Sequence, residues 1–146
     1  MDSLDSKEPI PFQRELEHTK AYLSLEKFRF GDDLNIKYDI QAMSFLLPPL
    51  SLQPIVENAV RHGIRETLDG KGTVTIMTRE YVDRNEIVVT DDGTDFDTNR
   101  SPDSDKPHIG IENVRYRLKS MCNGSLTIDS APEQGTVAVI TVPKGG

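Results

Sequence analysis

The stretch QPIVENAVRHGI, residues 53–64, places side chains that bind metal ions and phosphates on one side of an expected helix. Glu57, Asn58, Arg61 and His62 lie beside an apolar stripe at helical spacing. An Asn side chain offers a neutral oxygen to a hard cation such as Mg²⁺, which takes phosphate oxygens as further ligands. Arg61 or His62, one turn later, would then face the phosphates. The plainer alternative is a solvated helix face with an i,i+4 ion pair between Glu57 and Arg61.

A second stretch whose residues could bind a ligand is VVTDDGTDFD, residues 88–97, where an expected strand runs into an acidic turn. Asp-Gly is a common turn signal, so a plain turn is one explanation. The alternative is that Asp91, at the strand end, accepts a hydrogen bond from an amino group in a pocket. Adenine presents an amine donor at its position 6, where guanine presents an acceptor, so this carboxylate would favour adenine. Gly93 would let the backbone approach the base.

Glycines mark the starts of two later elements. Gly110 directly precedes an expected helix, whose first backbone N–H groups can meet phosphate oxygens. The alternative is an ordinary glycine before a helix. Gly135 and Thr136 open the last expected strand and, as a pair, indicate only a turn. The stretch before Gly110 has almost no apolar content, and a loop of that length is uncommon in a compact domain and usually functional or mobile.

Hydrophobic periodicity predicts the elements that must position these residues. We expect helices over residues 13–29, from about Leu50 onward, and over about 111–121. Strands are expected around residues 36–40 and over 73–79, 86–90, 125–130 and 136–142. The last strand is apolar on both faces, which suits a central position. Because strands and helices do not alternate strictly, we expect an α+β fold, a two-layer sandwich of a mixed β-sheet with helices on one face.

The composition limits the classes of function. A chain of 146 residues is near the size of one domain, and 36% hydrophobic with 28% charged residues is a soluble globular composition. The net charge of −7 repels phosphate backbones and anionic lipid, so neither nucleic acid nor a membrane surface is an expected partner. Cys122 is the only cysteine, which excludes an internal disulfide and fits a reducing, cytosolic setting. No apolar run approaches the ~20 residues needed to cross a bilayer.

The order of these motifs resembles a known family. LPPLSLQPIVENAVRHGI, DDGTDFD, IGIENVRYRL and QGTVAVITVP follow one another as in the catalytic ATP-binding domain of sensor histidine kinases. More narrowly, the chain resembles the LytS-type branch of the gyrase, histidine kinase and MutL ATPase superfamily. The stretch EHTKAYLSLEKFRFGDDLNIKYDI, residues 17–40, is also similar to that branch. The resemblance covers residues 8 to 143, and its first motif is the specific one.

The resemblance implies a Bergerat-type fold that holds ATP between a helical layer and a flexible lid. By carry-over, Asn58 would bind Mg²⁺, and Arg61 and His62 would lie near the phosphates. Asp91 would recognise adenine, with Gly93 beside it.

The other motifs of the family would complete the site. The loop from about Asp92 to Ile109 would be the ATP lid. Gly110 and Asn113 would belong to the second glycine box, and Gly135 and Thr136 to the third.

Three positions depart from the family pattern, which has glycines where this chain has Asp95, His108 and Glu133. An acidic side chain near a bound triphosphate would repel it, unless Asp95 points outward. These departures motivate an alternative function, that of a non-catalytic nucleotide-sensing or scaffold domain of the same fold.

The resemblance also implies a reaction. In hydrolysing relatives a glutamate four residues before the metal-binding Asn activates water, and this chain has Pro54 there. Since proline cannot act as a base, we expect a protein-histidine kinase, which transfers the γ-phosphoryl group of ATP to a histidine nitrogen. Positioning and charge neutralisation by Mg²⁺ and Arg61 would supply the catalysis. Glu57 lies about 100° around the helix from Asn58 and is a weaker catalytic candidate, which would orient Arg61 or meet the incoming histidine.

The family's organisation implies the partners. Its acceptor histidine lies in an upstream helical segment, to which we match nothing in this chain. We therefore expect that dimerisation and phosphoacceptor segment as a partner, a response regulator as the next phosphate acceptor, and a homodimer in the full-length protein. Residues 1–8 are expected to be the end of an upstream linker or a tailored end, 9–143 the catalytic domain and 144–146 a tail. The domain is expected to be cytoplasmic, in a membrane-bound parent, without touching the membrane itself.

Overall fold

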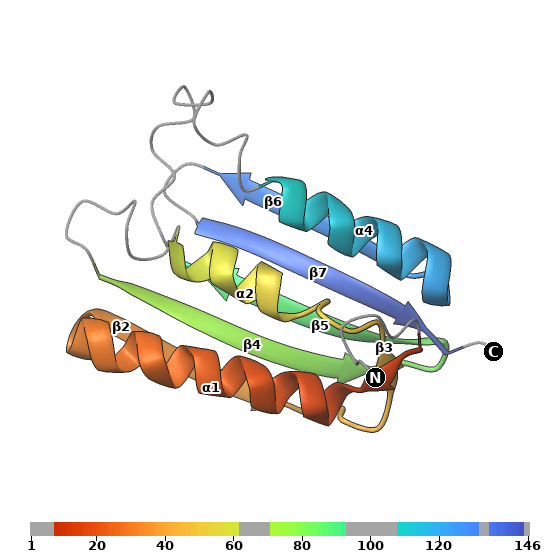
Figure 1. Ribbon diagram of the computed structural model, residues 1–146, viewed down its shortest axis with the longest axis horizontal. Helices are drawn as coiled ribbons and strands as arrows, with labels where there is room; N and C mark the ends of the chain where they lie inside the picture. The colour runs from red at the N-terminus through yellow and green to blue at the C-terminus, as the bar shows by residue number, and fades with distance from the viewer. Residues whose placement is uncertain (1–7, 62–70, 93–107, 132–134, 145–146) are drawn as a thin grey trace.

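A computed structural model describes residues 8–61, 71–92, 108–131 and 135–144 (Figure 1). Along the chain, the elements are β1 (Ile10–Pro11), α1 (Phe12–Phe30), the 3₁₀ helix η2 (Gly31–Asp33), β2 (Leu34–Ile40), β3 (Leu46–Leu47), α2 (Gln53–Val60), β4 (Gly72–Glu80), β5 (Arg84–Asp91), α4 (His108–Cys122), β6 (Ser125–Ala131) and β7 (Gly135–Pro143). Each of the expected helices and strands is present, with shifted ends.

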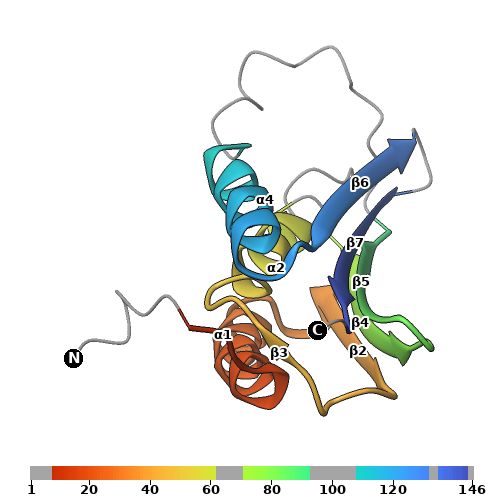
Figure 2. The same ribbon diagram turned by 90° about the vertical axis from the view of Figure 1, so that its right-hand side faces the viewer.

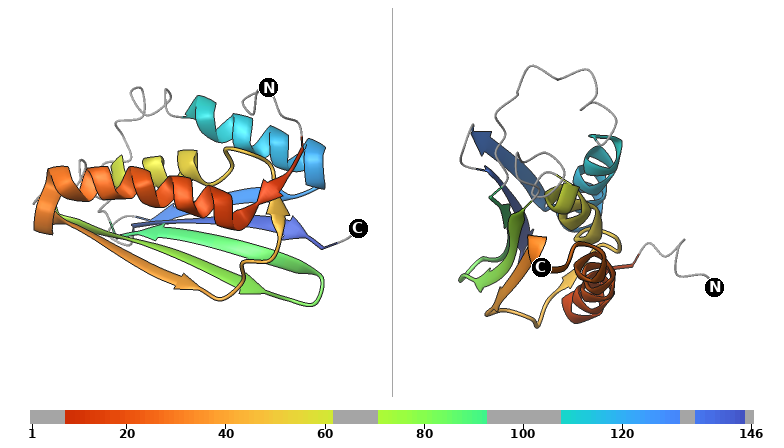
Figure 3. Two further views of the ribbon diagram at one scale, coloured as in Figure 1. Left: turned by 60° about the horizontal axis from the view of Figure 1, so that its bottom comes forward. Right: turned by 90° about the vertical axis from the view of Figure 1, so that its left-hand side faces the viewer.

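The described residues form a five-stranded mixed sheet with the order β2-β4-β5-β7-β6. β2 and β4 are parallel, and the other neighbouring strands are antiparallel. The end-on views show α1, α2 and α4 on one face of this sheet (Figures 2 and 3). The expected α+β sandwich with helices on one face is therefore confirmed. β7 lies between β5 and β6, which confirms that it is an interior strand.

The core lies between the sheet and the helices. Side chains of β4 and β5 alternate between buried and half-buried, as in a sheet that is covered on one face only. Fully burying a large apolar side chain contributes about 1.5–3 kcal/mol, so this layer supplies the main stabilisation. Its completely buried members include Phe12, Leu34, Leu52, Val56, Val74, Ile76, Ile87, Val114, Leu118 and Ile140.

Two helices begin at other residues than the periodicity predicts. α2 begins at Gln53 rather than near Leu50, because Leu50 has a φ of 60° and the chain turns there. Pro54 falls in the first turn as expected, where its missing N–H costs no hydrogen bond. α4 begins at His108 rather than near Ile111, so Gly110 lies inside its first turn. His108 and Gly110 add nothing to an apolar pattern, which explains the later expected start.

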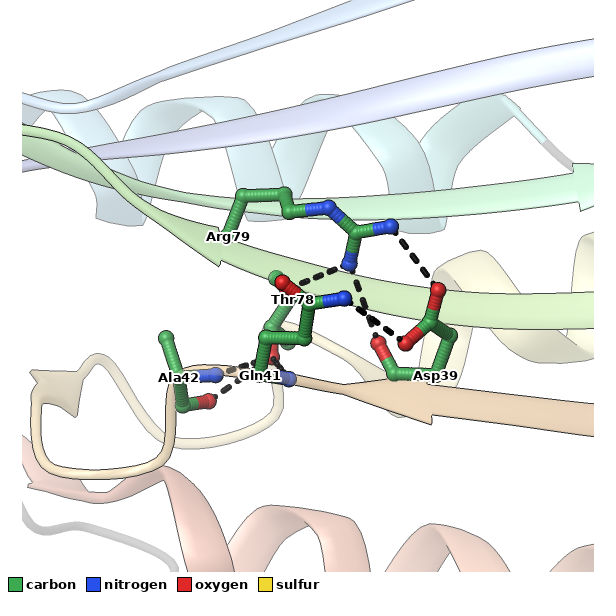
Figure 4. A network of polar contacts seen from close by, with 5 residues as sticks. All are labelled: Asp39, Gln41, Ala42, Thr78 and Arg79. Carbon is green, nitrogen blue, oxygen red and sulfur yellow. Dashed lines mark hydrogen bonds and ion pairs between the residues drawn. The ribbon is translucent and has the colours of Figure 1, made fainter.

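Thr78 fixes the end of the sheet at which β2 stops (Figure 4). Its fully buried hydroxyl donates to the carbonyl of Ala42 at 2.8 Å and accepts from the backbone N–H groups of Gln41 and Ala42 at 3.0 and 2.9 Å. Beside it, Arg79 forms an ion pair with Asp39 at 2.8 Å, and this contact lowers the pKa of the Asp39 carboxyl. These bonds hold the turn after β2 against β4.

Candidate functional site

Asp91 is a buried carboxylate at the end of β5, with 5% of its surface exposed. Side chains alternate along a strand, so Asp91 lies on the same face as the core residues Ile87 and Val89, toward the helices. The register places it opposite Val74 on β4 and Thr136 on β7. Thr136 is also buried, at 6% exposure. A carboxylate and a hydroxyl therefore lie on neighbouring strands at the end of the sheet, on its covered face.

Gly135 allows β7 to begin against the backbone of Asp91. It has a φ of 79°, and a Cβ at this position would overlap the Asp91 carbonyl oxygen. A side chain would therefore push β7 away from β5 at the residue where Asp91 pairs with Thr136. The sequence indicated only a turn here, whereas the structure shows a close approach of two strands that requires glycine.

The polar side of α2 is not a solvated face. Each residue from Gln53 to Arg61 is buried or half-buried, because α2 lies between α1 and α4 over the sheet (Figure 1). Within the described residues Arg61 reaches Asn58, with 3.4 Å from Nη1 to Oδ1. Glu57 instead accepts from Gln53, with 2.9 Å from Nε2 to Oε2. In place of the i,i+4 ion pair of the plainer alternative, Glu57 pairs with Gln53 at i,i+4 spacing and Arg61 with Asn58 at i,i+3 spacing.

α4 begins at the same end of the fold, at His108. The first-turn N–H groups of a helix have no partner within the helix and can bind an anion. Gly110 is half-buried in this turn, and a Cβ there would meet nothing within 4 Å. The backbone geometry therefore does not require glycine at this position. Asn113, one turn further, is exposed.

These elements meet at one end of the molecule. α2 and β5 end there, and β7 and α4 begin there, all toward the left in Figure 1. α2 contacts both β5 and α4, which fixes the three relative to one another. The described residues that the sequence assigned to a site belong to these parts of the elements: Glu57, Asn58, Arg61, Asp91, Gly110, Asn113, Gly135 and Thr136.

Two expected site residues, His62 and Gly93, lie outside the described residues, as do Asp95 and Glu133. The ends of the expected lid are described. Asp92 continues the ladder to β4: its N–H donates to the carbonyl of Thr73 at 3.2 Å, and its carboxylate accepts from the Thr73 N–H at 2.7 Å. Residues 108–109 belong to α4. The structure thus shortens the expected loop at both ends.

The donor types at this end fit a nucleotide with a magnesium ion. Within the part of the chain that the structure describes, no group of three or more His, Cys, Asp or Glu side chains could hold a metal. Mg²⁺ commonly keeps several waters and takes phosphate oxygens as ligands beside one or two protein oxygens, such as that of Asn58. A guanidinium such as that of Arg61 carries the positive charge that a phosphate needs, and a carboxylate such as that of Asp91 can accept a hydrogen bond from an amine.

Glu15 of α1 is a buried carboxylate, 3% exposed, that was not predicted from the sequence. Its carboxylate accepts from the N–H groups of Leu50 and Leu52 at 2.8 and 3.1 Å, directly before α2. A signal was present, because Glu15 falls within the apolar stripe that runs from Phe12 through Leu16. A charged residue on a core-facing stripe is rarely buried unless it is paired.

Comparisons with known proteins identify a family and related proteins. The family described as histidine kinase-, DNA gyrase B- and HSP90-like ATPase matches residues 48–146. The chain is 37% identical over 146 residues to the sensor histidine kinase YpdA of Escherichia coli (strain K12), covering 96% of this chain and 26% of that protein. It is 34% identical over 124 residues to the sensor protein LytS of Oceanobacillus iheyensis, covering 77% of this chain and 21% of that protein.

The fold is also found among solved structures. The catalytic domain of histidine kinase ThkA, in a nucleotide-free form, superposes with a TM-score of 0.69 at 12% identity, covering 93% of this chain and 94% of that one. At this identity the likeness concerns the fold alone. The chain spans about a quarter of YpdA and a fifth of LytS. None of the helices among the described residues is long and apolar enough to span a bilayer.

Proposed function

Because this chain belongs to the histidine kinase-, DNA gyrase B- and HSP90-like ATPase family, we propose that it is the ATP-binding catalytic domain of a two-component sensor histidine kinase. The resemblance noted from its motifs is confirmed at the level of the family. YpdA and LytS are named as sensor proteins, and their similarity extends over most of this chain. We take residues 9–143 as one catalytic domain.

The observation that carries the proposal is the buried Asp91 beside Gly135 and Thr136, at the sheet end where α2 stops. A carboxylate in this position accepts the amine of adenine and disfavours guanine. Asn58 provides the oxygen for Mg²⁺, and Arg61 neutralises phosphate charge. His62, Gly93, Gly110 and Asn113 complete the nucleotide site in this proposal.

The proposed reaction moves the γ-phosphoryl group of ATP to a nitrogen of a histidine in an upstream segment. The bond between the γ-phosphorus and the bridging oxygen breaks, a phosphorus–nitrogen bond forms, and ADP leaves. Pro54 stands four residues before Asn58 and has no group that could activate water, so this position favours transfer over hydrolysis. Catalysis comes from positioning and from neutralising charge, which are the main effects in phosphoryl transfer. Glu57, held by Gln53, is available to meet the incoming histidine.

The proposal includes the rest of the signalling path. A response regulator receives the phosphate from the histidine, and the upstream segment joins two copies into a homodimer. The domain works in the cytoplasm as part of a membrane-bound parent.

Nucleotide binding and phosphotransfer test this function together. We expect calorimetry to show binding of ATP that is stronger with Mg²⁺, and we expect the domain to label a supplied acceptor segment from γ-labelled ATP. The acceptor segment of a similar kinase, with its histidine changed to glutamine, serves as the control for acceptor specificity. A folded domain that binds no nucleotide would leave only the scaffold function, and binding without transfer to any acceptor would leave a nucleotide sensor.

A further inference from the structure

The residues between β3 and α2 carry an unusual main chain. Leu50 has a φ of 60°, in the left-handed region that side chains other than glycine rarely adopt. Ser51 is completely buried, and its hydroxyl donates to the Pro48 carbonyl at 2.7 Å. A conformation of this kind persists only where the surrounding contacts hold it in place.

Side chains from two different helices hold Leu50. Glu15 of α1 accepts from the Leu50 N–H through Oε2 at 2.8 Å and from the Leu52 N–H through Oε1 at 3.1 Å. Arg117 of α4 donates from Nη2 to the Leu50 carbonyl at 2.9 Å. Since α2 lies between α1 and α4, both of its neighbours bind the residue that leads into it (Figure 1).

The Glu15 carboxylate also lies at the favourable end of α2. Leu52 is the residue before the helix, and negative charge at a helix N-terminus is stabilised by the aligned peptide dipoles. Hydrogen bonds from backbone N–H groups to a carboxylate are roughly twice as strong as neutral ones. Because each carboxylate oxygen binds a different residue, Glu15 fixes both the position and the rotation of the helix start.

A displacement at this start would reach the functional end of α2. The helix has 8 residues, Gln53–Val60, so Asn58 lies fewer than two turns from Leu52. Asp91 and Thr136 are held differently, by the pairing of β5 with β7. The two halves of the site therefore have separate supports, α2 for the metal and phosphate side and the sheet for the base side.

We propose that Glu15 is a positioning residue for the metal side of the site, and that it acts by holding the main chain of Leu50 and Leu52. This inference rests on the proposed nucleotide binding. It assigns to α1 a role in the Mg²⁺-dependent part of ATP affinity and none in adenine recognition.

The test is Glu15→Gln, which keeps the size of the side chain and removes its charge. The glutamine amide turns an NH₂ group toward one of the two backbone N–H groups, so hydrogen exchange at Leu50 and Leu52 should become faster. We expect the gain in ATP affinity that Mg²⁺ provides to fall by about fivefold or more, while metal-free adenosine binds as in the wild type. Glu17→Gln, on the exposed side of the same helix, is the matched control and should change neither quantity.

The same measurements separate positioning from simple stabilisation. If Glu15 were only structural, Glu15→Gln would lower the melting temperature and leave the ratio of ATP dissociation constants with and without Mg²⁺ unchanged, which overturns the inference. Should that variant not fold, Arg117→Met releases Leu50 from the other side and must reduce the same gain for the inference to stand. If both single variants and the double variant fold, the fold-loss of the Mg²⁺-dependent gain in the double variant should be smaller than the product of the two single losses, because both substitutions act through Leu50. A folded wild type that binds no nucleotide overturns the proposed function, and this inference with it.

Discussion

Asp91 and Asp92 are neighbouring carboxylates with different surroundings. Asp91 is 5% exposed and faces the helices, whereas Asp92 is exposed and bonded to the backbone of Thr73. Only the first therefore lies on the covered face of the sheet, where the proposed recognition of adenine requires a carboxylate. Inside such a water-poor site a charged acceptor discriminates more strongly than it would in water.

Asp91→Asn should reduce the preference for ATP over GTP by about tenfold, because a neutral amide accepts more weakly from adenine and can donate to the guanine oxygen. Competition between the two nucleotides for a fluorescent ATP analogue measures the ratio. Asp92→Asn is the matched control and should leave it unchanged. An unaltered ratio in Asp91→Asn, with the nucleotide still bound, would count against the assignment of this residue.

At the residue scale, the sequence draws attention to candidate ligand-binding side chains more readily than to side chains that hold other residues. Asn58 and Asp91 stand out because their motifs combine an unusual residue type with a helix or strand end. Glu15 does not, because the groups that it binds are backbone N–H groups 35 and 37 residues away. Every residue except proline has a backbone N–H group, so the identity of the partner residues does not reveal such contacts.

Gly135 determines how closely two strands approach at the site. Its position opposite the backbone of Asp91 combines a positive φ with a lack of space for any side chain. β7 can therefore begin beside the end of β5 only with glycine at this residue. This close approach sets the relative position of β5 and β7, and so that of Asp91 and Thr136.

Gly135→Ala should destabilise the domain by about 2 kcal/mol or more, since strained φ values alone cost about 1–3 kcal/mol. Chemical denaturation measures the loss of unfolding free energy. Gly31→Ala separates the two causes, because Gly31 has a φ of 60° with nothing within 4 Å of a Cβ. The Gly135 variant should lose more stability than the Gly31 variant, and equal losses would contradict the steric contact with Asp91.

At the element scale, periodicity predicts each long helix and strand, because their apolar residues recur on one face. It does not predict β1 and β3, since strands of two residues, Ile10–Pro11 and Leu46–Leu47, are too short to show alternation. It also misses the starts of α2 and α4. The start of α2 depends on the turn at Leu50, and that of α4 falls at residues that add little to an apolar pattern.

At the scale of the whole molecule, the helical layer and the sheet carry different groups of the proposed nucleotide site. The sheet carries the groups proposed to recognise the base, and α2 carries those proposed for metal and phosphate. The motif order in the sequence predicts this division, because it identifies the family and so the end of the fold at which its motifs meet. It does not predict the support of α2 by α1 and α4, which depends on how the helices pack.

The net charge of −7 makes the metal half of the site the decisive one. An acidic domain repels a triphosphate unless a local cation offsets that repulsion. Arg61 is one such cation, and Mg²⁺ held by Asn58 is the second in this account. Binding of ATP should therefore depend on Mg²⁺ more strongly than binding of adenosine, which carries no phosphate.

Calorimetric titration of wild type and Asn58→Ala with ATP, with Mg²⁺ and with a chelator, tests this account most directly. We expect the wild type to bind ATP more tightly with Mg²⁺, and Asn58→Ala to lose about tenfold or more of that gain, since even indirect disturbance of a metal ligand costs 10–100-fold. Metal-free adenosine should bind both proteins equally. A folded Asn58→Ala protein that keeps the whole gain from Mg²⁺ would contradict the account.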